Sequence, residues 1–118
     1  MNHPESRLQT SCMTWFKYQY QSIAPLCFAV PNGGHRRITE ARILAGEGVK
    51  PGVSDVILLV PTESYSSLCI EFKVEKGKQT ELQRSWQELA EKHGNKYVIV
   101  RSFDEFRTAI TDYLCGKL

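Results

Sequence analysis

The pattern of apolar and polar positions along the chain predicts alternating helices and strands. Short apolar runs bounded by turn residues favour strands at 27–30, 56–60, 68–74 and 97–100. Apolar residues at helical spacing favour helices near both ends of the chain and after position 80, with a shorter helix over 39–45. The predicted order is helix, strand, short helix, strand, strand, helix, strand, helix. It implies one domain over residues 1–118, an α/β (α+β) fold whose mixed sheet of about four strands is flanked by helices.

The predicted strands 56–60 and 68–74 follow one another closely and are expected to pair as a hairpin. Because side chains alternate along a strand, Cys69, Glu71 and Lys73 share one face, and the apolar residues between them share the other. Asp55 precedes the first of these strands and comes within reach of Glu71 if the two pair. Charges resist burial unless they are paired or bind a metal. Two hypotheses stay open: a divalent-cation site with a lysine beside it, or an ordinary cross-strand ion pair.

The predicted helices have capping signals and apolar faces. At the N-terminus, Asn2 is expected to be the N-cap, with Glu5 at the capping-box position. The helix that begins after position 80 is expected to pack through Leu82, Trp86 and Leu89. These assignments place a helix before the first strand and another directly after the strand that carries Glu71.

Composition narrows the classes of protein that fit. The chain has 118 residues, 42% of them hydrophobic and 24% charged, and a formal net charge of +2. This charge does not require a nucleic-acid partner, so any phosphate-binding surface must come from local clustering. The apolar stretches are too short for a membrane span and there is no signal-peptide pattern, so we expect a soluble cytoplasmic protein. The four scattered cysteines predict buried free thiols and give no support to a redox or metal-storage protein.

Asp55, followed sixteen positions later by Glu71-Phe72-Lys73, resembles the PD-(D/E)xK nuclease signature. The surroundings are similar to the VRR-NUC family, the virus-type replication-repair nucleases, over about residues 5–114. The similar stretches are 30–34, 48–55, 76–78 and the glutamine at 83. Members of the family usually have a proline directly before the aspartate, where this chain has Ser54.

This resemblance implies a restriction-endonuclease-like core and a metal-dependent DNA endonuclease. Such an enzyme would hydrolyse phosphodiester bonds in branched or junction DNA during replication, repair or recombination, working as a homodimer in a bacterial or phage-infected cell. Asp55, Glu71 and the backbone carbonyl of Phe72 would hold Mg²⁺ or Mn²⁺. Lys73 would orient the attacking water or neutralise the phosphoryl oxygens. The alternative is a non-catalytic DNA- or protein-binding module that keeps the fold, which the presence of Asp55, Glu71 and Lys73 together disfavours.

Glu5 and Gln83 each have two interpretations. Glu5 is either a capping residue that interacts with the helix dipole or, as the resemblance implies, a further acid at the metal site. Gln83 either completes a capping box with Thr80 or, by the same resemblance, lies near the attacking water or the substrate phosphate. The two roles of Gln83 are not exclusive.

Basic residues follow two turn-rich stretches and are candidates for contact with the DNA backbone. Arg36 and Arg37 come directly after a glycine turn, where backbone N–H groups and cations approach phosphates, although a solvated loop explains the same pattern. Lys76 and Lys78 follow the strand that carries Glu71. The predicted DNA-binding residues are therefore Arg36, Arg37, Lys76 and Lys78.

Overall fold

The computed structural model describes residues 3–31 and 37–118. Its elements are α1 (Pro4–Gln19), the 3-10 helix η1 (Gln21–Leu26), β1 (Cys27–Ala29), α2 (Ile38–Gly46), β2 (Val56–Leu58), β3 (Leu68–Phe72), α3 (Glu81–Lys92), β4 (Lys96–Val100) and α4 (Phe103–Leu114). The predicted order of helices and strands is confirmed, with η1 in addition. The first three strands end one or two residues earlier than predicted.

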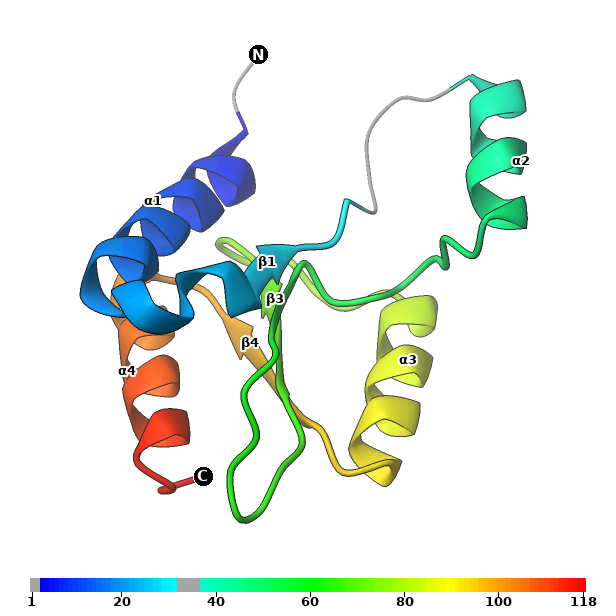
Figure 1. The fold of residues 1–118 in the computed structure, drawn as a ribbon. Coiled ribbons are helices and arrows are strands. Elements are labelled where there is room, and N and C mark those ends of the chain that lie inside the picture. Colours follow the sequence, from blue (N-terminus) through cyan, green and yellow to red (C-terminus); the bar gives the residue numbers. More distant parts are fainter. Residues whose placement is uncertain (1–2, 32–36) are drawn as a thin grey trace.

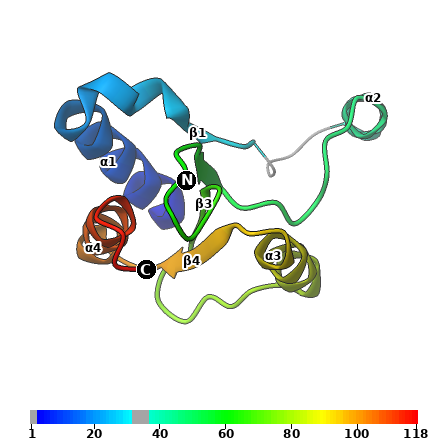
Figure 2. The ribbon, with the colours of Figure 1, turned by 60° about the horizontal axis from the view of Figure 1, so that its bottom comes forward.

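The predicted mixed sheet of about four strands is confirmed, and its strands lie in the order β1-β2-β3-β4. β2 pairs antiparallel with both β1 and β3, whereas β3 and β4 are parallel. The predicted hairpin is confirmed, with Val56 opposite Ile70 and Leu58 opposite Leu68. Helices α1 and α4 cover one face of the sheet and α3 lies on the other, while α2 stands away from this body (Figures 1 and 2). The architecture is therefore a three-layer body with one helix projecting from it.

The apolar core lies between the sheet and the α1/α4 layer. Leu68, Ile70 and Phe72, which the predicted alternation put on one face of β3, are at most 1% exposed. The Phe72 ring stacks on Phe106 of α4, with ring centroids 5.8 Å apart. Burying one such side chain contributes roughly 1.5–3 kcal/mol. This core holds β3 rigidly, so residues on its opposite face have fixed positions.

The predicted packing of α3 is wrong for its two leucines. Leu82 and Leu89 are each 58% exposed, and only Trp86 of the three is half-buried. The half-buried face of α3 instead includes Gln83, Trp86 and Gln87, a stripe shifted around the helix from the leucines. The reason is that this helix packs against β4, and the glutamines on its inward face have hydrogen-bond partners there: Gln83 donates to Glu71, and Gln87 accepts from Gln79. Leucines in the same positions would leave those polar groups unpaired.

The predicted start of α1 is also wrong. The helix begins at Pro4 with His3 as its N-cap, and no side chain caps it. Glu5 is therefore one position too early to complete a capping box. Proline suits the first helical position because its φ is already helical and its missing N–H would have had no intrahelical partner. Asn2 itself lies outside the described residues.

Two further expectations concern the cysteines, predicted to be buried free thiols, and the apolar stretches, predicted to be too short for a membrane span. Cys12, Cys27 and Cys69 are buried free thiols as predicted, whereas Cys115 is exposed because it follows the last turn of α4. In residues 3–31 and 37–118, no helix is long and apolar enough to cross a membrane.

Gly52 lets the loop before β2 touch the start of α3. Its φ is +82°, a left-handed conformation that side chains with a Cβ disfavour. A Cβ added there would lie 2.6 Å from the Leu82 carbonyl oxygen and 3.1 Å from the Gln83 nitrogen. The loop that leads to Asp55 and the helix that carries Gln83 are thus packed backbone against backbone.

We predict that Gly52→Ala destabilises the fold, because it combines left-handed strain with a backbone clash. The expected loss is about 1–3 kcal/mol in the free energy of unfolding, measured by urea denaturation. Gly46→Ala is the matched control: Gly46 ends α2, and a Cβ there would meet nothing within 4 Å. Equal stability of the two variants would contradict the proposed packing role of Gly52.

Candidate active site

Asp55 is anchored where β2 begins. Its backbone carbonyl accepts a hydrogen bond from the Val30 N–H at 2.8 Å, and its side-chain Oδ2 accepts one from the Phe72 N–H at 2.7 Å. The preceding Ser54 is fully buried and donates from Oγ to the Val56 carbonyl at 3.3 Å. At the position where the family usually has proline, this chain therefore has a hydrogen-bonded serine. These contacts fix the Asp55 carboxylate beside the end of β3.

Glu71 is a buried acid near the end of β3, on the sheet face that α3 covers. It is 2% exposed. Its Oε2 accepts from Gln83 Nε2 at 3.1 Å and lies 3.7 Å from the ammonium nitrogen of Lys73, while its Oε1 accepts from the Tyr97 hydroxyl at 3.4 Å. Polar groups on three elements or their ends therefore surround this carboxylate. The ion pair of Lys73 is therefore with Glu71, two residues before it along the chain, and not with an acid across the strands as one hypothesis had it.

The pKa of the Glu71 carboxyl is raised from an ordinary 4.5 to about 8. Burial is the largest cause because it disfavours the charged form, and the neighbouring Asp55 raises the pKa further. Lys73 and the Tyr97 hydroxyl act in the opposite direction. The two acids are thus close enough to repel one another when both are ionised, and a bound cation would relieve that repulsion.

Gln83 makes the contacts expected of a capping residue and also contacts Glu71 of the site. Its backbone N–H donates to Thr80 Oγ1 at 3.1 Å, and its Oε1 accepts from the Thr80 N–H at 2.9 Å, which completes the capping box. The other end of the same amide, Nε2, donates to Glu71. The cap therefore fixes the direction in which the amide nitrogen points, and a role of Gln83 in catalysis stays a prediction.

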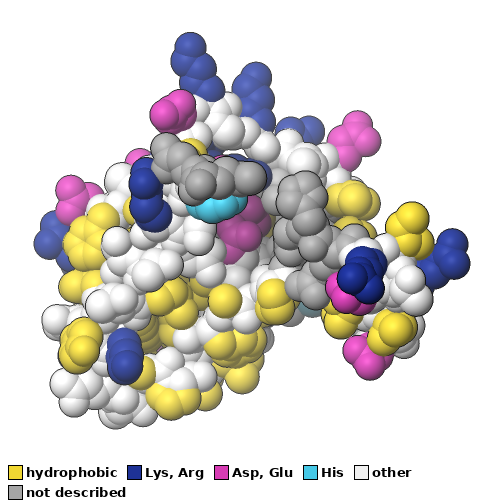
Figure 3. Space-filling view, turned by 90° about the horizontal axis from the view of Figure 1, so that it is seen from above, with side chains coloured by type: hydrophobic (Ala, Val, Ile, Leu, Met, Phe, Trp, Pro, Cys, Tyr) yellow, Lys and Arg dark blue, Asp and Glu magenta, His cyan; other side chains and the backbone are white. Residues whose placement is uncertain are grey.

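One hollow brings together the predicted acids, lysine and glutamine. It has a volume of about 240 Å³, and its lining includes Glu5, Asp55, Glu71, Lys73 and Gln83. Figure 3 looks down on this end of the molecule, where acidic side chains lie in a depression with Lys and Arg side chains around it. Residues that are far apart in the sequence thus meet at one polar opening.

The residues in this hollow fit a divalent cation held by two carboxylates. Within the described ranges, no three His, Cys, Asp or Glu side chains converge closely enough to hold a metal. Asp55 and Glu71 are thus the close pair, whereas Glu5 is exposed in the first turn of α1. Mg²⁺ commonly uses one or two carboxylates and keeps several waters or substrate oxygens. The donor set therefore suits Mg²⁺ or Mn²⁺ without a third acid.

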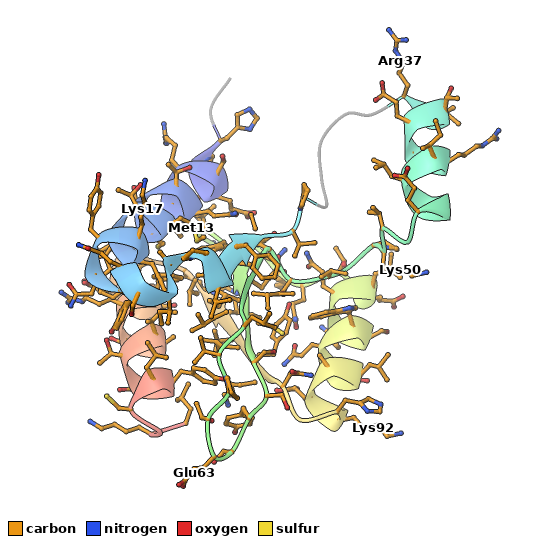
Figure 4. All side chains as sticks on the ribbon, in the orientation of Figure 1. Met13, Lys17, Arg37, Lys50, Glu63 and Lys92 are labelled. Atoms are coloured by element: carbon orange, nitrogen blue, oxygen red, sulfur yellow. The ribbon has the colours of Figure 1, made fainter. Side chains whose placement is uncertain are left out.

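The predicted DNA-binding residues lie in two separate places. Lys76 and Lys78 are exposed in the loop after β3, on either side of Gly77. A Cβ on Gly77 would lie 3.7 Å from the Glu5 carboxylate, so this loop borders the hollow. Arg37 is the N-cap of α2 and extends from the far tip of that helix (Figure 4). Arg36 lies outside the described residues.

The sequence analysis missed Tyr97 and Gln79, which also contact this site. Tyr97 is 5% exposed and donates to Glu71, and Gln79 donates from Nε2 to the Tyr97 hydroxyl at 3.4 Å. The available signal was the hydroxyl of Tyr97, at the start of a predicted strand. It points to Glu71 only once the parallel pairing of β3 and β4 is known.

The family match assigns the class of this fold and site: a nuclease-type domain. The chain matches the model of the VRR-NUC domain over residues 3–104, and it belongs to that family. A solved structure of a "VRR_NUC domain protein" is 25% identical and superposes with a TM-score of 0.83, covering 98% of this chain and 91% of that one. No curated protein matches. Membership implies DNA binding and, for the family in general, a need for divalent metal ions.

The raised pKa of Glu71 predicts how the stability of the metal-free protein depends on pH. The folded state holds the Glu71 proton up to about pH 8, whereas the unfolded chain releases it near 4.5. Folding is therefore favoured most below the lower value, and the contribution is lost as pH rises toward the upper one. In EDTA, Glu71→Gln should remove this loss and raise the denaturation midpoint at about pH 8 above that of the original protein.

Glu88→Gln is the matched control for this experiment, because Glu88 is exposed on α3. Urea denaturation of the three proteins between about pH 5 and about pH 8 measures the effect. A pH dependence shared by all three would show that Glu71 does not titrate in this range.

Proposed function

We propose that this chain is a divalent-metal-dependent endodeoxyribonuclease that cuts branched or junction DNA in replication, repair or recombination. The supporting observation is the pair formed by the half-buried Asp55 and the buried Glu71, with Lys73 beside it, lining a hollow of a nuclease fold. Holding a buried acid and a buried lysine beside a half-buried acid costs stability. A catalytic role at a phosphodiester would explain why the chain keeps this arrangement.

Asp55, Glu71 and the backbone carbonyl of Phe72 would hold one Mg²⁺ or Mn²⁺ ion. Bound there, the ion would supply activation of water and neutralisation of charge at the scissile phosphate. The hydrogen bond from the Phe72 N–H to Asp55 Oδ2 restrains the rotation of that carboxylate. The core packing of the Phe72 ring restrains the backbone. The ligands are thus positioned before a metal arrives, which reduces the entropy cost of binding it.

Lys73 and Gln83 supply the polar groups next to the acids. The Lys73 ammonium is 3.7 Å from Glu71 Oε2 and nearly buried, so its charge is only weakly screened by solvent. We assign it to orienting the attacking water or neutralising the phosphoryl oxygens. The Gln83 amide holds Glu71 and can also donate toward water or phosphate. Glu5, at the rim of the hollow, is the further acid that would approach from α1.

Basic residues would hold the DNA backbone at two places. Lys76 and Lys78 lie beside the hollow, whereas Arg36 and Arg37 precede α2 and would contact a different part of the substrate. Contacts of this kind are independent of sequence and sensitive to salt. Two separated contact regions suit a substrate with more than one duplex arm, which supports the choice of branched DNA.

We predict metal-dependent cleavage of a branched substrate that requires both acids. Labelled four-way junction, flap and linear duplex DNA are each incubated with Mg²⁺, Mn²⁺ or EDTA. Asp55→Asn and Glu71→Gln should lower the rate of cutting by about 10²–10³-fold or more, because each removes a charge that holds the cation. DNA binding in EDTA should stay within about twofold of that of the original protein, because neither acid contacts the backbone directly.

Asp104→Asn is the matched control: this exposed acid on α4 pairs with Arg107 and is not among the residues that line the hollow. It should cut at the original rate. Full activity of Asp55→Asn and Glu71→Gln would remove the acids from the mechanism. Binding without cutting by the original protein, on every substrate and metal, would favour the non-catalytic binding module.

We also propose that two copies form a symmetric dimer through α2. No residue of this helix is buried, and Ile38 and Ile43 are 72% and 57% exposed. A helix of nine residues is marginal in water without packing. Something must therefore cover its apolar side, and the chain offers a suitable surface of its own.

That surface is the apolar hollow between α3 and the sheet, with a volume of about 350 Å³ and a lining that includes Ile57, Leu59, Trp86 and Leu89. Both helices carry exposed charges of each sign, so the apolar character of the two surfaces supports the contact. Exposed apolar residues of α2 in one copy would thus meet the apolar hollow beside α3 of the other. A reciprocal exchange of this kind closes with twofold symmetry, and a dimer would present two hollows for cutting two strands.

Ile43→Asp should convert the dimer to a monomer, because a charge in the apolar contact would have no partner. Sedimentation velocity of the full chain measures the change. Tyr18→Asp is the control, since Tyr18 is 68% exposed on α1, and it should leave the dimer intact. A dimer that persists in Ile43→Asp would move the interface elsewhere, and a monomeric original protein would remove the dimer altogether.

A further inference from the structure

We propose that Tyr97 positions the Glu71 carboxylate for the metal, and that Gln79 sets the direction of the Tyr97 hydroxyl. This inference rests on the proposed metal site. It assigns a positioning role to two residues that lie behind the acids rather than beside the substrate.

The sheet places Tyr97 next to Glu71. In the parallel pairing of β3 and β4, Tyr97 is opposite Cys69 and Ile99 is opposite Glu71. Tyr97 is therefore the diagonal neighbour of Glu71 on the same face of the sheet. Its ring contacts Trp86 of α3, with centroids 6.2 Å apart, and it is 5% exposed. The hydroxyl is thus held between the sheet and α3 with little freedom to turn away.

The two oxygens of Glu71 are held from different elements. The Tyr97 hydroxyl donates to Oε1 at 3.4 Å from β4, whereas Gln83 donates to Oε2 at 3.1 Å from α3. A carboxylate held at both oxygens cannot rotate about its last bond without losing a partner. The 3.4 Å separation is long for such a bond, and hydrogen bonds in active sites commonly tighten when the site is loaded.

Gln79 determines which way the Tyr97 hydroxyl points. A tyrosine hydroxyl has one proton to donate, and its oxygen also accepts. Gln79 Nε2 donates to that oxygen at 3.4 Å, so the hydroxyl proton is left for Glu71. The same Nε2 donates to Gln87 Oε1 at 2.7 Å, and Gln87 Nε2 donates to Glu91 at 3.3 Å. The bonds donated by Gln79 therefore diverge: one leads through the Tyr97 hydroxyl to Glu71, and the other leads through Gln87 to Glu91.

The second deeply buried tyrosine shows what a purely structural hydroxyl looks like. Tyr113 of α4 is 1% exposed and donates to the Val60 carbonyl at 2.6 Å. It belongs to the apolar core on the other face of the sheet. Its removal costs one hydrogen bond of the fold and none of the site, so Tyr113→Phe is the matched control.

The test is Mn²⁺ affinity, measured by isothermal titration calorimetry on the full chain without DNA. Tyr97→Phe removes only the hydroxyl and should weaken Mn²⁺ binding by about 10-fold or more, the usual effect of losing a partner behind a metal ligand. Gln79→Met should weaken it in the same direction by a smaller factor. Tyr113→Phe should bind Mn²⁺ as the original protein does while unfolding at lower urea. DNA affinity in EDTA should be unchanged in Tyr97→Phe.

The failure of this inference is distinguishable from failure of the proposed function. If the original protein binds Mn²⁺ and Asp55→Asn does not, the metal site stands, and unchanged affinity in Tyr97→Phe and Gln79→Met overturns the positioning role. If the original protein itself binds no Mn²⁺ at millimolar concentration, the proposed function falls and the positioning role with it. Should Tyr97→Phe not fold, Gln79→Met decides the question, because Gln79 lies in the loop before α3 outside the core.

Discussion

The burial of one carboxylate, that of Glu71, is the constraint on which the polar half of this molecule depends. A charged group taken out of water is tolerated only where neighbours satisfy it. Each surrounding part contributes: Lys73 from the end of β3, Gln83 from α3 and Tyr97 from β4. Asp55 adds an opposing effect, since its charge raises the pKa of Glu71. The Glu71 carboxylate thus has hydrogen-bond partners, but the repulsion between it and Asp55 is not fully balanced. A bound cation would balance it.

The same constraint explains the unusual packing of α3. Its inward face carries glutamines because Gln83 hydrogen-bonds Glu71 and Gln87 hydrogen-bonds Gln79, which in turn donates to Tyr97. The leucines are consequently turned outward, and Leu89 lines the apolar hollow between α3 and the sheet. One face of the sheet therefore packs into the apolar core, and the other face carries the polar residues of the candidate site. The proposed dimer contact is a direct consequence, because α2 has exposed apolar residues of its own.

Local sequence patterns predicted the parts of this fold that local physics determines. Alternation in β3 placed Ile70 in the core and Glu71 on the polar face, and the hairpin placed Asp55 within hydrogen-bonding distance of the Phe72 backbone. Tyr97 was missed because parallel strands are joined by a long crossover, which leaves their register open until the tertiary fold sets it. The prediction of Asn2 as N-cap was wrong because Pro4 is the first helical residue, which makes His3 the N-cap. Contacts between distant segments were therefore the least predictable, and Tyr97 and Gln79 belong to that group.

The central claim is that Asp55 and Glu71 hold one divalent cation in this hollow. The most direct measurement is a crystal of the full chain soaked in Mn²⁺, with anomalous diffraction locating the ion. The account predicts the strongest peak between the Asp55 and Glu71 carboxylates, at bonding distance from both, and its disappearance in Asp55→Asn. A strongest peak elsewhere, or none at the pair in a well-ordered crystal, would contradict the account and leave the two acids as parts of an ion-pair network.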